Sequence, residues 1–129
     1  MKKVLRVTST QDYITLVHSL LVITTPFALI SAYSTPFELK HALELTKPTR
    51  LFVNSHLLSL VLPVAKKVGI PLNRIYVLGG NARGRKSFKE LIEDIRSQQT
   101  PIVSPRPAKR DTLAYLAFSS GTTGLPKGF

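Results

Sequence analysis

The sequence predicts an α/β fold, a partial three-layer sheet of mainly parallel strands with helices on both faces. Short apolar runs begin near residues 27, 50, 74 and 113, and segments with helix-capping signals lie between them. Apolar residues make up 43% of the 129 residues, which is enough for one hydrophobic core. Strands that alternate with helices favour βαβ units, in which each crossover helix brings the next strand back parallel to the last.

The expected strands are short apolar runs bounded by turn residues. They cover residues 27–32, 50–54, 74–78 and 113–118. The first ten residues match no pattern that assigns them to an element. The expected sheet therefore has four strands in this chain.

The expected helices are placed by their first and last residues. One begins after Thr10 and runs to about Leu21, and another extends from Ser87 or Phe88 to Gln98. The segment 35–38 is a capping box with proline at the first helical position, so a helix runs from there to about residue 46. A fourth helix is capped by Ser55 and ends at residues 68–69, and Pro63 inside it predicts a kink or a late start.

The most informative segment is SSGTTGLPKG, residues 119–128, which directly follows the last apolar run. Glycines allow a backbone to approach an anion closely and to point its N–H groups at it. Serine and threonine hydroxyls donate to phosphate oxygens, and a lysine adds a positive charge. The candidate phosphate-binding residues are Ser119, Ser120, Gly121, Thr122, Thr123, Gly124 and Lys127. The alternative is a solvated turn that binds nothing.

This run resembles the phosphate-loop signature of adenylate-forming enzymes, the AMP-dependent synthetases and ligases, and is most similar to 4-coumarate–CoA ligases and other acyl-CoA synthetases. The resemblance extends more loosely over residues 11–128. It implies that residues 1–129 are part of an N-terminal AMP-binding domain, with a basic Pro-rich linker at 99–112, and that the chain is a fragment. It also places the next strand of the sheet beyond this chain, which would leave 113–118 as an unpaired apolar edge.

By this resemblance, the full enzyme joins ATP and a carboxylic acid into an acyl-adenylate and then transfers the acyl group to CoA, with Mg²⁺ as cofactor. The candidate loop would hold the β- and γ-phosphates, whereas the acyl pocket and a catalytic lysine would follow later in the sequence. We therefore expect no catalytic residue in this chain and no adenylation by this chain alone. The resemblance implies a cytoplasmic or peroxisomal location.

The charge of +11, from 18 basic and 7 acidic residues, raises the alternative of a small basic nucleic-acid-binding or membrane-associated protein. Basic clusters at 83–89 and 106–110 contain no interleaved aromatic pattern typical of nucleic-acid modules, so no nucleic-acid partner is expected. The uncharged run 14–33 has the length of a membrane span, but Pro26 and its neighbouring threonines divide it into a helix and a strand. Membrane association thus stays an alternative that is less favoured than a ligase fragment.

Two further features, a near P-loop and the histidine content, do not indicate a site. Residues 79–87 nearly match the P-loop GxxxxGK[ST], but Arg85 is inserted between the second glycine and the lysine, so the segment is interpreted as a surface connection. The chain has no cysteine, and its three histidines are scattered along the sequence. No metal site is expected.

Overall fold

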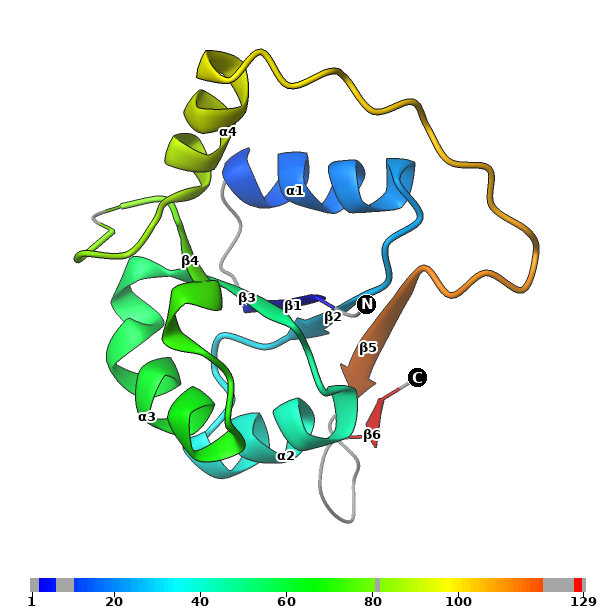
Figure 1. The fold of residues 1–129 in the computed structure, drawn as a ribbon. Helices are drawn as coiled ribbons and strands as arrows, with labels where there is room; N and C mark the ends of the chain where they lie inside the picture. Colours follow the sequence, from blue (N-terminus) through cyan, green and yellow to red (C-terminus); the bar gives the residue numbers. More distant parts are fainter. Residues whose placement is uncertain (1–2, 7–10, 81, 120–126, 129) are drawn as a thin grey trace.

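The computed structural model describes residues 3–6, 11–80, 82–119 and 127–128, and Figure 1 shows their arrangement. A six-stranded sheet has the order β4-β3-β1-β2-β5-β6. Its strands are β1 (Lys3–Arg6), β2 (Phe27–Ile30), β3 (Arg50–Asn54), β4 (Ile75–Leu78), β5 (Tyr115–Ser119) and β6 (Lys127–Gly128). The first five strands are parallel, and β6 is antiparallel to β5. The predicted α/β class with a mainly parallel sheet is confirmed.

Two strands differ from the expectation. β1 lies in the middle of the sheet, where Val4 pairs with Ala28 of β2 and with Leu51 of β3. Its sequence KVLR is short and half basic, and two neighbouring strands supply the hydrogen bonds that make it a strand. The prediction that residues 113–118 form an unpaired edge is wrong, because β6 pairs with β5 within this chain.

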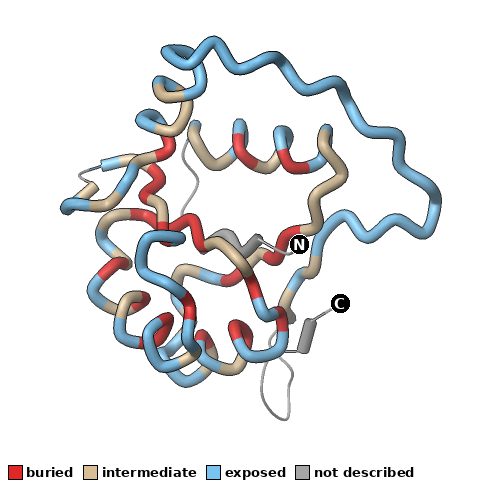
Figure 2. Tube along the Cα trace, viewed as in Figure 1, coloured by how far each residue is buried: buried red, intermediate tan, exposed pale blue. Residues whose placement is uncertain are grey.

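The helices cover both faces of the sheet, as predicted. On one face, α1 (Gln11–Val22) and α4 (Phe88–Ser97) pack on a cluster that includes Phe27 and Phe52. On the other face, α2 (Pro36–Thr46) and α3 (Leu58–Val68) bury a second cluster. Each fully buried Leu or Phe side chain contributes about 1.5–3 kcal/mol of transfer free energy. Figure 2 shows the buried residues concentrated where the helices face the strands.

Most helix ends form as their sequences predict. Thr35 and Glu38 form the capping box of α2 with Pro36 at its start, and Gly69 ends α3 in the left-handed region at φ 82°. Ser55 is not the cap of α3, which corrects the expectation. It opens a 3₁₀ turn, Ser55–Leu57, so α3 begins only at Leu58. This late start is one of the two outcomes that Pro63 predicted.

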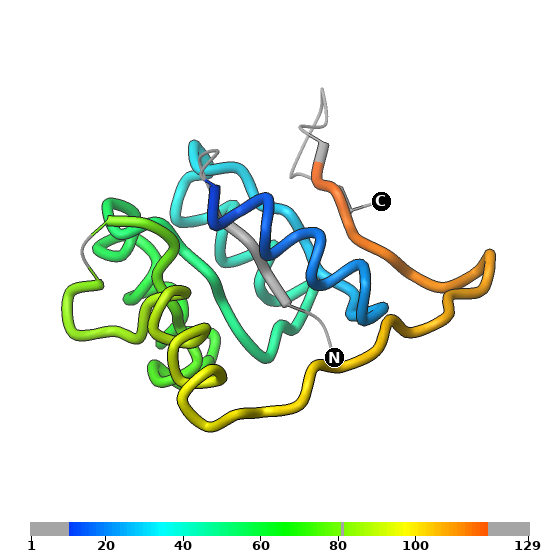
Figure 3. The backbone as a smooth tube through the Cα atoms, turned by 90° about the horizontal axis from the view of Figure 1, so that it is seen from above, coloured from blue at the N-terminus to red at the C-terminus, as the bar shows by residue number. Residues whose placement is uncertain are grey.

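The basic linker, residues 99–112, connects α4 to the approach to β5 and is exposed along its whole length. Figure 3 shows it running from the end of α4 around α1 toward β5. The backbone N–H of Arg106 donates to the carbonyl of Val22 at 2.9 Å, which fastens the linker to the last turn of α1.

The uncharged run 14–33 divides as the sequence predicts. Its first part lies in α1 and its second contains β2, with turn residues between them. Within the described residues, no helix combines the length and the apolar character needed to cross a bilayer.

Candidate functional site

The candidate phosphate loop begins at the carboxyl end of β5. Of the predicted residues, Ser119 ends β5 and Lys127 begins β6, and their Cα atoms are register partners in the antiparallel pair. Directly opposed residues in such a pair have Cα atoms about 4.5–5.5 Å apart. The other predicted residues lie outside the described part of the chain: Ser120, Gly121, Thr122, Thr123 and Gly124. The fold thus brings the two ends of the candidate loop together.

β5 is held in the sheet by its neighbour β2. Tyr115 pairs with Phe27, and their rings stack with centroids 5.7 Å apart and planes 22° from parallel. On the opposite face of the strand, Leu116 and Phe118 pack against the cluster under α2 and α3. Both faces of the strand that ends at Ser119 therefore contact other parts of the molecule.

The carboxyl ends of the five parallel strands lie at one edge of the sheet, where ligands of open α/β sheets bind. Beside the end of β5, β2 leads into the capped start of α2. The Thr35 backbone N–H donates to a carboxylate oxygen of Glu38 at 2.8 Å, and the Glu38 N–H donates to the Thr35 hydroxyl at 3.3 Å. The hydrogen bonds from Thr35 lower the pKa of Glu38 below its ordinary value.

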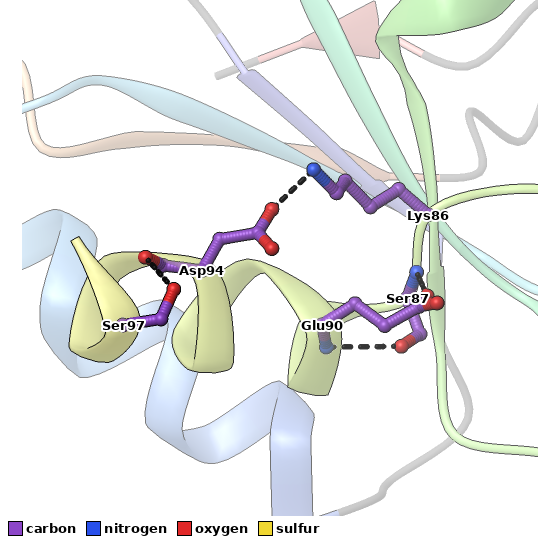
Figure 4. A network of polar contacts seen from close by, with 5 residues as sticks. All are labelled: Lys86, Ser87, Glu90, Asp94 and Ser97. Carbon is purple, nitrogen blue, oxygen red and sulfur yellow. Dashed lines mark hydrogen bonds and ion pairs between the residues drawn. The ribbon is translucent and has the colours of Figure 1, made fainter.

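The structure explains why the near P-loop at residues 79–87 is not a second site of this kind. Lys86 forms an ion pair with Asp94 of α4, and the Ser87 hydroxyl accepts the Glu90 N–H at 3.1 Å, as Figure 4 shows. Asp94 raises the pKa of Lys86 through its hydrogen bond and its charge. Arg85, the inserted residue, donates to the Leu72 carbonyl at 2.8 Å. The lysine and serine of this pattern therefore stabilise the start of α4.

A polar hollow of about 280 Å³ lies beyond the carboxyl end of β4, and the sequence did not predict it. Two parts of the chain line it, the start of α1 and the stretch from the end of β4 to the start of α4, with residues Gln11, Asp12, Gly79, Gly80, Ser87 and Lys89. The Gly79 N–H donates to a carboxylate oxygen of Asp12 at 3.2 Å. The signal in the sequence was the near P-loop at residues 79–87, which contains Gly79, Gly80 and Ser87 of this lining but gives no indication of Gln11 or Asp12. Strands β3, β1 and β2 separate β4 from β5, so this hollow is distinct from the candidate loop.

Metal ligands are not gathered in the described part of the chain. No group of three or more His, Asp or Glu side chains able to hold a metal ion occurs among those residues.

Comparison with known proteins identifies the family. The model of the AMP-binding enzyme family matches residues 7–129. This chain therefore belongs to the AMP-binding, adenylate-forming enzyme family.

Two curated relatives come from Alternaria alternata. The acyl-CoA ligase AFT1-1 is 28% identical over 123 residues, covering 90% of this chain and 21% of the relative. The acyl-CoA ligase AKT1 is 32% identical over 105 residues, covering 76% of this chain and 18% of the relative. The chain thus spans about a fifth of the length of these relatives.

Solved structures share the fold. The anthranilate CoA ligase AuaEII in complex with anthranoyl-AMP matches with a TM-score of 0.83 at 24% identity, covering 98% of this chain and 24% of that one. The luciferase-like enzyme from the mealworm Zophobas morio matches with a TM-score of 0.79 at 23% identity, covering 98% of this chain and 29% of that one. The three-layer arrangement is therefore that of adenylate-forming enzymes.

Proposed function

We propose that this chain supplies the nucleotide phosphate-binding loop of an acid–CoA ligase. The observation that carries the proposal is the sequence of residues 119–128, which begins at the carboxyl end of β5. Ser119 of β5 and Lys127 of β6 are partners in the antiparallel pair. Membership of the AMP-binding family and the acyl-CoA ligase relatives support the reaction class. Residues 1–129 would be part of the N-terminal AMP-binding domain, with the basic linker inside it.

The donors of the loop fit a polyphosphate. The hydroxyls of Ser119, Ser120, Thr122 and Thr123 and the glycine N–H groups would bind the β- and γ-phosphate oxygens, and Lys127 would offset their negative charge. No carboxylate occurs in the run, so Mg²⁺ would be held mainly through the phosphate oxygens of the nucleotide. The metal supplies charge neutralisation of the departing pyrophosphate.

The proposed reaction has two steps. A carboxylate attacks the α-phosphorus of ATP, forming an acyl-adenylate and releasing pyrophosphate, and the CoA thiol then displaces AMP to give a thioester. This chain would bind and orient the polyphosphate in the first step. No residue of this chain is assigned to binding the carboxylic acid or CoA. We propose a cytoplasmic or peroxisomal location for the enzyme.

The test measures binding of ATP and of inorganic tripolyphosphate to the chain. The Lys127→Ala variant should weaken binding of both about tenfold or more, because a charge-assisted hydrogen bond to phosphate contributes about 1.5–3 kcal/mol. The matched control is Lys67→Ala, which removes one charge from the exposed end of α3 and should leave binding unchanged. Equal weakening by the two variants would show that only net charge attracts the anion, and would contradict the proposed loop.

A further inference from the structure

An edge of the molecule remote from the candidate loop combines exposed aliphatic side chains with unpaired cations. In the basic linker, Ile102 is 98% exposed and Val103 is 60% exposed. Near the linker, Leu21 and Val22 at the end of α1 are 41% and 47% exposed, and Leu113 is 43% exposed. Aliphatic groups exposed to water are unfavourable, and an excess of them on one side of a molecule marks a surface that binds a partner.

The linker is fastened to α1, and its last residues share a hollow with the end of that helix. The Arg106 N–H donates to the Val22 carbonyl at 2.9 Å. A small, mostly apolar hollow of about 110 Å³ lies between the two segments, lined by Leu20, Leu21, Thr24 and Thr25 on one side and by Ala108, Thr112, Leu113 and Ala114 on the other. The surface formed by the linker and the end of α1 is called the linker edge below.

The cations of the linker edge are Arg106, Lys109 and Arg110, with Asp111 as the single carboxylate of the linker. In the described part of the chain, the ion pairs are Lys40–Glu44 and Lys86–Asp94, and neither involves these three cations. The excess charge of +11 on the whole chain adds to the attraction of any anionic partner. The linker edge therefore presents uncompensated positive charge beside aliphatic side chains.

We propose that the linker edge docks peripherally on a bilayer that contains anionic phospholipids. Headgroup phosphates attract arginine and lysine, and the interfacial region accepts short aliphatic side chains without a preformed groove. A nucleic acid would attract the linker cations but would offer no apolar surface for the aliphatic side chains. The linker also has no aromatic side chain on which bases could stack.

The experiment is co-sedimentation of the chain with vesicles of phosphatidylcholine alone and of phosphatidylcholine mixed with phosphatidylserine. Binding is expected only to the mixed vesicles, and it should weaken as salt is added. Two variants, I102S/V103S and R106S/K109S/R110S, should each lower the bound fraction, the second by about tenfold or more. The matched control K66S/K67S/R74S removes three exposed cations from the α3 side of the sheet and should bind like the wild type.

A second measurement on the wild type is independent of whether the variants fold. Acetylation of lysine amines followed by mass spectrometry should show Lys109 protected by mixed vesicles and Lys66 unprotected. The proposal is overturned by an absence of binding to mixed vesicles, by equal losses in the two triple variants, or by unchanged binding of I102S/V103S. Displacement of the vesicles by an oligonucleotide bound through the same three linker cations would also overturn it.

Discussion

At the scale of single residues, Ser87 and Glu90 determine where α4 begins. The Ser87 N–H donates to a Glu90 carboxylate oxygen at 2.6 Å, and the Ser87 hydroxyl accepts the Glu90 N–H in return. These bonds satisfy two N–H groups that a helix start otherwise leaves without partners. Ser87→Ala should lower the free energy of unfolding by about 1 kcal/mol in urea denaturation. Ser104→Ala, in the exposed linker, is the control and should change it by less than about 0.5 kcal/mol.

The same capping box makes stability depend on pH in the acid range. Hydrogen bonds from Ser87 hold the pKa of Glu90 below its ordinary value in the folded chain. Because the pKa of Glu90 is lower in the folded chain than in the unfolded chain, its ionised carboxylate stabilises the fold at neutral pH. This stabilisation is lost as the pH falls below about 4.3, the pKa of an unperturbed glutamate, toward the lower pKa of the folded chain. The stability difference between wild type and Glu90→Gln should therefore narrow on acidification. A difference that stayed constant from neutral pH into this range would contradict the role assigned to Glu90.

At the scale of elements, the turn after β4 depends on a close approach to the start of the 3₁₀ turn. Gly80 has φ +65°, and a Cβ atom there would lie 2.5 Å from the Ser55 hydroxyl oxygen. Gly84 has φ +76° but has no atom within 4 Å of such a Cβ. Gly84→Ala should thus cost about 1 kcal/mol from backbone strain alone. Gly80→Ala should cost about 1 kcal/mol more, because the Ser55 hydroxyl has to turn away.

Thermal and urea unfolding of the two alanine variants measure this difference directly. Equal destabilisation would show that the contact with Ser55 is not tight. Gly80 and Gly84 both lie between β4 and α4 and both have positive φ. The difference between the two variants therefore isolates the contact with Ser55.

The elements with local signals were predictable from the sequence. Apolar runs predicted β2 to β5, and the capping boxes at Thr35 and Ser87 predicted α2 and α4. β1 and β6 were not predictable, because the first is a short, half-basic segment and the second has only two residues. Both are strands because their neighbours in the sheet supply the hydrogen bonds, and no local pattern encodes that.

The candidate site comes from the sequence alone and its chemistry stays a prediction, whereas its surroundings had no signal in the sequence. The order of hydroxyls, glycines and lysine in residues 119–128 indicated a phosphate loop without any structure. That Ser119 and Lys127 are register partners depends on β6, which was not expected. The hollow beside Gly79 was missed because Gln11 and Asp12, which line it together with residues between β4 and α4, are brought there only by the tertiary fold.

At the scale of the whole molecule, the sheet has two polar regions at the carboxyl edge of its parallel strands. One is the candidate loop at β5 and the other is the hollow at β4, and three strands lie between them. The chain belongs to the AMP-binding enzyme family, yet it spans about a fifth of the length of its curated relatives. The proposed function places the polyphosphate at the candidate loop, and the hollow at β4 serves as the comparison within the same chain.

The most direct measurement is an NMR titration of the isotope-labelled chain with pyrophosphate, following the backbone amide of each residue. The proposed function predicts that the amide signals of Gly121, Thr122, Thr123 and Gly124 shift in a saturable way, while those of Gly79 and Gly80 stay in place. Saturable shifts at Gly79 and Gly80, with none at residues 121–124, would contradict the assignment of the phosphate loop.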